Sequence, residues 1–233
     1  SSFLVMRNFT EDIASIIRAT WYDLPGIEPL EVDDKLAEVH NTVDGDNLYI
    51  KNEMYKCPGL RKIHLETAKL GSLDILHSVY WPDPKYNLPI FGCDLVSTPT
   101  VTTAAIVDVS PISGTNRIHD RISEVSNNFN SFTENRELPK WATVFSPHCK
   151  FMRLSKEIEK AWFYQVVMEY LIIVCDEVRN AQPASPLATA QRMADQIRYS
   201  NQQKKNDKTR RILEKCFNEE WADNYINKIL FDA

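Results

Sequence analysis

The middle of the chain alternates between apolar and polar positions with a period of two residues, which is typical of β-strands. The segments with this pattern are 47–56, 60–69, 73–81, 89–97 and 101–109. Their connections are short and rich in proline, asparagine, glycine and serine, and residues 82–88 form the clearest hairpin. Because such connections leave no room for crossover helices, we predict a mainly antiparallel sheet.

The N-terminal part of the chain has a helical pattern. A helix is predicted to begin at Thr10, whose side chain can cap it, and isoleucines at positions 13, 16 and 17 form an apolar stripe along it. Residues 22–46 contain two prolines and many acidic residues, so we expect a loop-rich segment there.

The C-terminal part also has helical periodicity. Ser155 is a candidate cap for a long, largely apolar helix over 156–180, which Pro183 would terminate. Two more helices are predicted at 187–203 and about 208–230, and a shorter one near 117–129. The aromatic run at 162–164 is interpreted as core packing of the long helix.

A block of strands with helices at both ends predicts helices packed on both faces of one sheet. The expected fold class is therefore α/β of the α+β type, a three-layer α/β/α sandwich around a central, mainly antiparallel sheet. A hydrophobic content of 43% in 233 residues is enough for a sizeable core, and 10% aromatic residues could enclose a flat ligand.

Composition excludes several classes of protein. A formal charge of −5 argues against a general nucleic-acid binder, and the apolar runs are shorter than the roughly 18–20 residues of a membrane span. Five scattered cysteines without CxxC spacing are typical of reduced thiols, so we expect a cytoplasmic protein. There is no GxGxxG motif, no cysteine cluster and no HExxH motif. If this chain carries out redox chemistry, we expect a partner to bring the electrons.

Two predicted strands each place one ionisable side chain among apolar neighbours. His77 shares a face with Ile75, Val79 and Trp81, and Asp94 shares one with Ile90, Gly92 and Val96. Such groups are costly to bury unless they are hydrogen-bonded or used in chemistry, and both readings are open. Gly92 is expected to leave room for a bulky group. One face of four strands could present His64, Glu66, His77, Asp94 and Thr103 toward a common space.

A second polar feature is the stretch 202–211, which carries five lysine and arginine residues and one acid, Asp207. Its charge pattern alone is that of the solvated start of a helix.

Six segments, in this order, resemble the ferredoxin-dependent bilin reductase family. They are HLETAKLG (64–71), LDILH (73–77), LPIFGCD (88–94), AAIVDVSP (104–111), RELPKW (136–141) and QQKKNDKTRR (202–211). The resemblance extends from about residue 50 to the C-terminus. It implies one bilin reductase domain over residues 1–233, with an open-chain tetrapyrrole held between the sheet and the C-terminal helices.

The resemblance also implies an activity. It is the four-electron reduction of biliverdin IXα to phycocyanobilin, with ferredoxin as one-electron donor, bilin radical intermediates and side chains that supply protons. No metal or cofactor would be bound, and we expect a monomer with no nucleic-acid partner and no membrane span.

The resemblance assigns catalytic roles to three of the sheet residues. Asp94 and His77 correspond to a central acid pair beside the pyrrole nitrogens and lactam oxygens, and Glu66 corresponds to the donor that protonates the outer vinyl group. His64 corresponds to a histidine that supports these catalytic residues. An apolar sheet face suits such a role because burial raises the pKa of a carboxyl group.

Five further residues are assigned to substrate binding by the resemblance. Arg136 and Lys208 would each pair with a propionate, and Thr103 stands where close relatives have a serine that binds a propionate. Asn206 and Asp207 would hold or hydrate the tetrapyrrole. A guanidinium group suits bidentate carboxylate binding.

Two alternatives to this reading are a related reductase that yields phycoerythrobilin and a non-catalytic bilin carrier. The presence of Glu66 argues against the first alternative. Keeping three proton donors together argues against the second, because binding alone does not need them.

Overall fold

The computed structural model describes residues 8–233, so the first seven residues of the predicted domain lie outside it. Its centre is one antiparallel sheet of eight strands in the order β1-β3-β4-β5-β6-β7-β8, with β2 also paired to β3. The strands are β1 (Glu28–Pro29), β2 (Glu38–Val43), β3 (Asp46–Cys57), β4 (Leu60–Leu70), β5 (Leu73–Pro82), β6 (Ile90–Ser97), β7 (Thr102–Ser110) and β8 (Lys150–Leu154). The predicted antiparallel sheet is confirmed.

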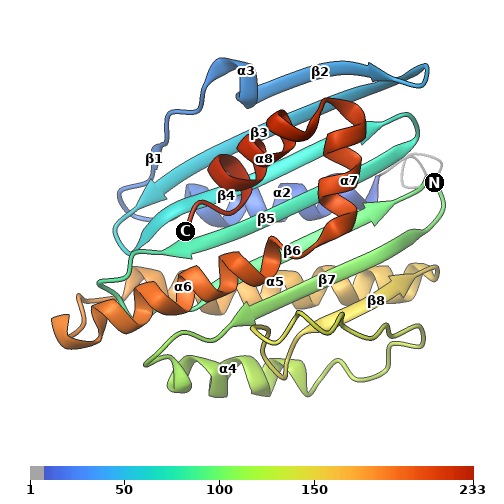
Figure 1. Ribbon diagram of the computed structural model, residues 1–233. Helices are drawn as coiled ribbons and strands as arrows, with labels where there is room; N and C mark the ends of the chain where they lie inside the picture. Colours follow the sequence, from blue (N-terminus) through green and yellow to red (C-terminus); the bar gives the residue numbers. More distant parts are fainter. Residues whose placement is uncertain (1–7) are drawn as a thin grey trace.

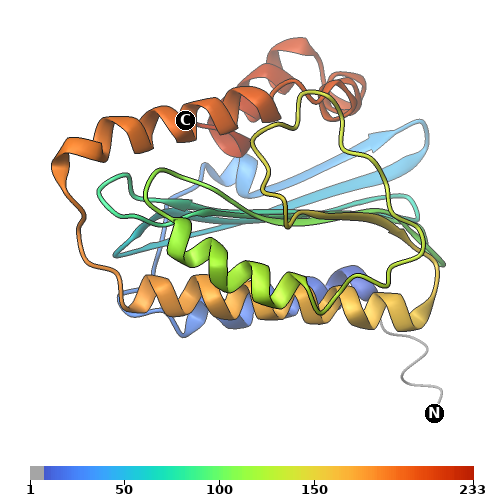
Figure 2. The same cartoon turned by 90° about the horizontal axis from the view of Figure 1, so that it is seen from below.

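Helices cover both faces of the sheet, as Figures 1 and 2 show. One face carries α2 (Phe9–Tyr22), α4 (Asn116–Ser126) and α5 (Glu157–Arg179). The other carries α6 (Thr189–Gln203), α7 (Asp207–Cys216), α8 (Glu219–Tyr225) and the π-helical turn η2 (Ile226–Leu230), while the short α3 (Asp34–Ala37) and η1 (Pro186–Ala188) lie in connections. The predicted three-layer sandwich is therefore confirmed.

The alternation along the strands divides the core into two apolar clusters. Leu65, Leu76 and Leu95 belong to the cluster that packs against α2 and α5. Phe163 is fully buried in this cluster, which confirms that the aromatic run of the long helix is core packing. Val79 and Trp81 belong to the second cluster, under the C-terminal helices. The second face is the one that carries His77.

Both predicted helix caps are wrong. The N-cap of α2 is Asn8, whose side chain accepts from the amide of Glu11, and the Thr10 hydroxyl instead bonds Ser97 Oγ at 3.1 Å. The N-cap of α5 is Lys156, without a side-chain cap, because the Ser155 hydroxyl donates to the Glu134 carboxylate. In both cases a tertiary contact takes the hydroxyl group that the local pattern assigned to the helix.

Three segments also differ from the prediction. The expected loop at 22–46 contains β1, α3 and β2, because its backbone completes the edge of the sheet beside β3. The short strand β8 lies in a segment that carries no clear alternation. The last predicted helix is broken at Phe217, and Asn218 caps a new helix by accepting from the amide of Trp221 at 2.7 Å.

The position of α6 over the sheet depends on a buried arginine. Arg192 is 1% exposed and donates to the carbonyls of Pro84 and Ser185 and to the side chains of Asn87 and Thr189. Pro84 and Asn87 belong to the connection between β5 and β6. Arg192 therefore fixes α6 to the hairpin that carries His77 and Asp94.

We predict that Arg192→Met lowers the free energy of unfolding by about 3 kcal/mol, because methionine keeps the apolar stem but leaves buried acceptors unpaired. The matched control is Arg198→Met, an exposed arginine on the same helix, which should change stability by less than about 0.5 kcal/mol. Chemical denaturation of the three proteins measures both values. Equal stability of the two variants would contradict this role of Arg192.

Candidate active site

The register of three neighbouring strands brings the predicted acidic groups together. Glu66 of β4 lies opposite His77 of β5, which lies opposite Asp94 of β6. Residues paired in this way point to the same face of a sheet. The row continues to Asn52 on β3 and Ile106 on β7. The predicted convergence of Glu66, His77 and Asp94 on one face is what the register gives.

His77 and Asp94 form a direct pair, with 2.6 Å between His77 Nδ1 and Asp94 Oδ1. The His77 side chain is 9% exposed, whereas that of Asp94 is 44% exposed. Burial opposes a charge on the imidazole, but the charge and hydrogen bond of Asp94, helped by the charge of Glu66, outweigh it and raise the pKa of His77. Among the described residues, His77 Nε2 is buried without a hydrogen-bond partner. The pair can therefore hold a proton, and His77 Nε2 remains available to donate a hydrogen bond to a bound molecule.

Glu66 is held by a hydrogen bond from the hydroxyl of Tyr225 on α8. Burial raises the pKa of the Glu66 carboxyl, and the Asp94 carboxylate adds to this, while His77 and the Tyr225 hydrogen bond act against it. A carboxyl group in this state can keep a proton closer to neutral pH than an exposed one, which is the property that a general acid needs.

His64 lies on the same face of the sheet, two residues along β4 from Glu66. It is fully buried, its ring centroid is 5.7 Å from that of His77, and its Nε2 is 2.7 Å from Asn52 Oδ1. Burial, together with the positive charges of Lys62 and His77, places the pKa of His64 well below its ordinary value. His64 is therefore neutral, and it supports the site without contributing a charge.

The sheet around Asp94 is apolar and open on this face. The half-buried neighbours of Asp94 that share its face are Ile75, Val96, Ala104, Ile106 and Phe151. Leu95, Ala105 and Met152, which alternate with them, are fully buried against the other helical layer. These side chains leave a partly exposed apolar area beside the His77–Asp94 pair.

The space at Gly92 is filled by a protein side chain. A Cβ atom at Gly92 would lie 3.0 Å from the Tyr199 hydroxyl, and Tyr199 is 2% exposed, with its ring against Trp81. The inference that glycine makes room here is right. The bulky group is the tyrosine by which α6 packs on the sheet.

Thr103 lies at a register shift in β7. Strict alternation groups it with Ala105 and Val107, which face α2 and α5, but the register shifts between Val96 and Ser97 opposite it. Thr102 occupies the α2 side at this point, since its hydroxyl lies 2.9 Å from Ser97 Oγ, and the Thr103 hydroxyl donates to the Val96 carbonyl at 3.1 Å. The alternation with Ala105 therefore does not extend to Thr103, and its place in the common space stays a prediction.

Arg136 lies at the β8 side of the open apolar area. Its guanidinium carbon is 5.0 Å from the centroid of the Phe151 ring, and its Nη1 donates to the Thr103 carbonyl at 3.0 Å. Phe151 pairs with Ile106, which pairs with Asp94. Arg136 is exposed, so its remaining donors can reach an anion at this edge of the site.

The other predicted binding residues lie at the turn between α6 and α7. Asn206 caps α7 by accepting from the amide of Thr209, and Asp207 and Lys208 are exposed in its first turn. This is also the solvated helix start that the charge pattern indicates. Figure 1 places the turn in the helical layer that covers the His77 face.

Sequence reasoning missed the residues that the C-terminus contributes. Phe231 is 6% exposed, and its ring centroid is 5.6 Å from that of His77. The buried Lys62 donates to the Ile229 carbonyl at 2.5 Å and lies 3.4 Å from Asp232, which also pairs with Arg61 at 3.2 Å. The one feature of the sequence that could have indicated this contact is a lysine among the apolar residues of β4. A buried lysine needs a partner from elsewhere in the chain.

Asp108 of β7 is a buried carboxyl group that holds a loop in place. It is 2% exposed and accepts from the amide and hydroxyl of Ser146 and from the hydroxyl of Ser110. Burial raises its pKa to about 6 against these hydrogen bonds. Asp108 thus fixes the connection between α4 and β8 to the His77 face.

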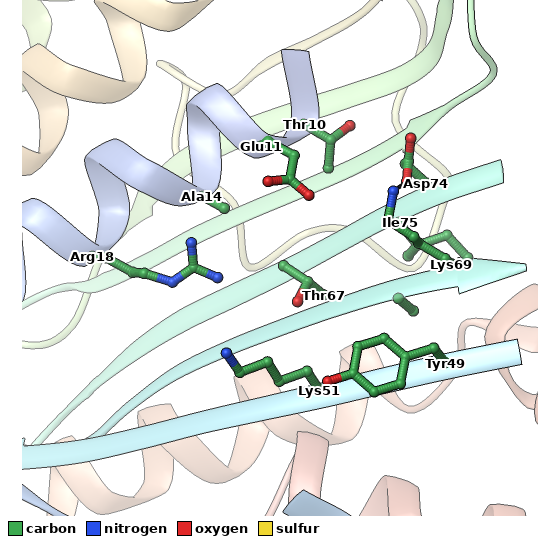
Figure 3. Close-up of a pocket in the computed structure, with 11 residues that line it drawn as sticks. Thr10, Glu11, Ala14, Arg18, Tyr49, Lys51, Thr67, Lys69, Asp74 and Ile75 are labelled. Atoms are coloured by element: carbon green, nitrogen blue, oxygen red, sulfur yellow. Dashed lines mark ion pairs between the residues drawn. The ribbon is translucent and has the colours of Figure 1, made fainter. Parts of the chain in front are cut away.

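A separate recess of about 360 Å³ lies between α2 and strands β3–β5. Figure 3 shows Arg18 of α2 above Lys51 of β3 there. Two of the cationic groups that line the recess are already in ion pairs. Arg18 binds Glu53 at 2.9 Å, and Lys69 binds Asp74 at 3.0 Å. The recess contains none of the predicted site residues.

Residues 8–233 contain no group of three or more His, Cys, Asp or Glu side chains arranged to hold a metal ion. In the same part of the chain, each helix is too short or too polar to cross a bilayer.

Comparison with known proteins gives concordant results. A family model described as ferredoxin-dependent bilin reductase matches residues 14–232. Phycocyanobilin:ferredoxin oxidoreductase of Synechococcus sp. (strain CC9902) is 47% identical over 225 residues, covering 94% of this chain and 91% of that protein. The protein of the same name from Synechococcus sp. (strain CC9605) is 45% identical over 226 residues, with the same coverage. The crystal structure of phytochromobilin synthase from tomato in complex with biliverdin has the same fold, with a TM-score of 0.80, 15% identity and coverage of 97% of this chain and 83% of that chain.

We predict that an NMR titration places the pKa of His77 above its ordinary value of 6.5, and that Asp94→Asn lowers it, because burial and Lys62 then act without the opposing carboxylate. The folded-state pKa is raised, so the stability from this pair is complete below about pH 6.5 and is lost as pH rises through that pKa. His148 is the internal control, since its lowered pKa depends on burial and Lys150. An unchanged His77 titration in the variant would contradict the pairing.

Proposed function

The chain belongs to the ferredoxin-dependent bilin reductase family, and we propose that it reduces biliverdin IXα to phycocyanobilin by a radical mechanism in which side chains supply the protons. One observation supports this proposal above the others. The row of Glu66, His77 and Asp94 places three proton-bearing groups beside an open apolar area of the sheet.

The proposed reaction has two stages, and each adds two electrons and two protons to the bilin. Four molecules of reduced ferredoxin supply the four electrons, one at a time. The Asp94–His77 pair protonates the bound biliverdin first, because it couples a carboxylate to an imidazole of raised pKa. Glu66 delivers a proton to the outer vinyl group, which becomes ethyl. Exchange with solvent restores the protons of these side chains.

Substrate binding is proposed to use both edges of the apolar area. Arg136 at the β8 edge and Lys208 on the first turn of α7 would each pair with a propionate, and both are exposed. Asn206 and Asp207 would hold or hydrate the tetrapyrrole beside Lys208. Thr103 would help at the Arg136 edge, where its carbonyl accepts a hydrogen bond from Arg136, and His64 would support His77 through the contact between their rings.

The electron donor is proposed to dock at the outer surface of α6 and its junction with α7. Plant-type ferredoxins are acidic and this chain is also acidic overall, so docking needs a local basic area. Arg210 pairs with Asp223, and Lys69 pairs with Asp74. The remaining basic candidates are Lys204, Lys205 and Arg211. The preceding helix α6 also carries the exposed apolar side chains of Met193 and Ile197.

We predict that Glu66→Gln and Asp94→Asn stop the reaction at different points. Glu66→Gln should slow the vinyl stage by about 100-fold or more, so that a partly reduced bilin with its outer vinyl group intact accumulates. Asp94→Asn should bind biliverdin and accept an electron, then stall as a long-lived bilin radical. Chromatography of the products and electron paramagnetic resonance measure these outcomes.

Glu31→Gln, at an exposed carboxyl group, is the control and should match the parent. Production of phycocyanobilin at the parent rate by Glu66→Gln or by Asp94→Asn would remove that residue from the proposed mechanism.

We predict that Lys204→Glu combined with Lys205→Glu lowers the ferredoxin-limited rate and flattens its dependence on salt. Exposed charges interact over about 8–10 Å near physiological ionic strength, so the parent rate should fall as salt rises. Lys35→Glu combined with Lys85→Glu changes the net charge equally at exposed positions away from the α6–α7 junction. Equal losses in the two double variants would show that overall charge, and not a local docking area, controls the rate.

A further inference from the structure

A buried chain of hydrogen bonds ends on the Glu66 carboxylate. Asn52 Nδ2 lies 2.8 Å from the Leu36 carbonyl and 3.0 Å from the Tyr225 hydroxyl, and that hydroxyl donates to Glu66 Oε2. Asn52 is 6% exposed and Tyr225 is fully buried. The chain connects α3 and β3 to α8 and ends at the residue proposed to protonate the vinyl group.

The Leu36 carbonyl fixes the orientation of the Asn52 amide. A carbonyl can only accept, so the atom of Asn52 that faces it must be the amide nitrogen. The second N–H of the same amide then points to the Tyr225 oxygen. The Tyr225 hydroxyl has two acceptors in reach, Asn52 Oδ1 at 3.3 Å and the closer Glu66 Oε2, so the bond to Glu66 is the stronger one. The Asn52 oxygen faces His64, which must carry its proton on Nε2.

An aromatic stack holds the Tyr225 ring in the orientation that points its hydroxyl to Glu66. The ring centroids of Phe217 and Trp221 are 3.7 Å apart, with an interplanar angle of 18°. Those of Trp221 and Tyr225 are 4.8 Å apart, with an angle of 13°. The three residues are spaced by four positions along the chain through α8. A stacked ring has little rotational freedom, so the position of the hydroxyl is set by the helix.

We infer that Tyr225, oriented by Asn52, is a positioning residue for Glu66 that holds one carboxyl oxygen and leaves the other to carry the transferable proton. Because Oε2 accepts from Tyr225, a proton on Glu66 resides on Oε1. This inference rests on the proposed role of Glu66 in the vinyl stage. The hydrogen bond from Tyr225 explains why the Glu66 carboxyl group would present its proton in one direction only.

Tyr225 also affects the acid strength of Glu66. Burial disfavours the carboxylate that remains after the proton has left, and the Tyr225 hydrogen bond stabilises that carboxylate. Without the hydroxyl, Glu66 would hold its proton to higher pH and release it less readily. Position and acid strength would therefore change together.

The test is Tyr225→Phe, which keeps the ring stack and removes only the hydroxyl. The vinyl stage should slow about tenfold, the ratio corresponding to one hydrogen bond to a charged group, while biliverdin binding and the other two-electron stage stay at the parent level. The alkaline limb of the pH profile of the vinyl stage should move to higher pH, since Glu66 must be protonated to act. A simple packing defect would not move that limb.

Two further variants complete the experiment. Tyr80→Phe removes another buried, hydrogen-bonded hydroxyl from the opposite face of the sheet, and it should leave both stages unchanged. Glu66→Gln combined with Tyr225→Phe should behave as Glu66→Gln alone, because Tyr225 acts through Glu66. Asn52→Ala, which takes away the donor to the Tyr225 oxygen, should show the same selective loss of the vinyl stage.

Parent-like product ratios and pH profile in Tyr225→Phe would overturn the inference. Equal losses in binding and in both stages, or a double variant much slower than Glu66→Gln, would also overturn it by showing a general structural role. These results are distinct from failure of the proposed function, in which Glu66→Gln itself makes phycocyanobilin at the parent rate.

Discussion

The register between β4, β5 and β6 is the constraint on which the site depends. A shift of one residue would turn His77 away from Asp94 and Glu66 and into the apolar layer under α2 and α5. The tight connections at 71–72 and 83–89 set this register. Arg192 then secures α6 to the second connection, so the helical layer above the site is placed by the same hairpin.

The C-terminal helical layer contacts Glu66 and His77 but leaves Asp94 exposed. Tyr225 binds Glu66, Phe231 covers His77, and the ion pairs of Asp232 with Arg61 and Lys62 hold the C-terminal residues in place. Asp94 stays 44% exposed beside half-buried apolar neighbours. The protein therefore keeps its internal hydrogen bonds at the β3–β5 side of the site and presents a partly exposed apolar area at the β6–β8 side. This division leaves a proton-bearing pair beside a surface on which an apolar substrate can lie.

Features that repeat along the strands could be predicted from the sequence, whereas contacts between the helices and the sheet could not. Alternation along the strands identified the five central strands and grouped His77 and Asp94 with their faces, because a sheet repeats every two residues. Alternation could not assign a face to Thr103, because the register shift beside it interrupts that repeat. Tyr199 at Gly92, Tyr225 at Glu66 and Phe231 at His77 could not be foreseen, since packing between a helix and a sheet has no local sequence signal. Resemblance to a family supplied the roles, which the residues alone left open.

The proposed function requires the substrate to lie on the open apolar area of β5–β8, against the His77–Asp94 pair. A crystal structure of the complex with biliverdin tests this most directly. We expect the tetrapyrrole to lie over Val96 and Ile106, with Asp94 and His77 Nε2 within hydrogen-bond distance of its pyrrole nitrogens or lactam oxygens. A tetrapyrrole bound elsewhere, for example in the recess between α2 and β3–β5, with His77 and Asp94 out of contact, would contradict it.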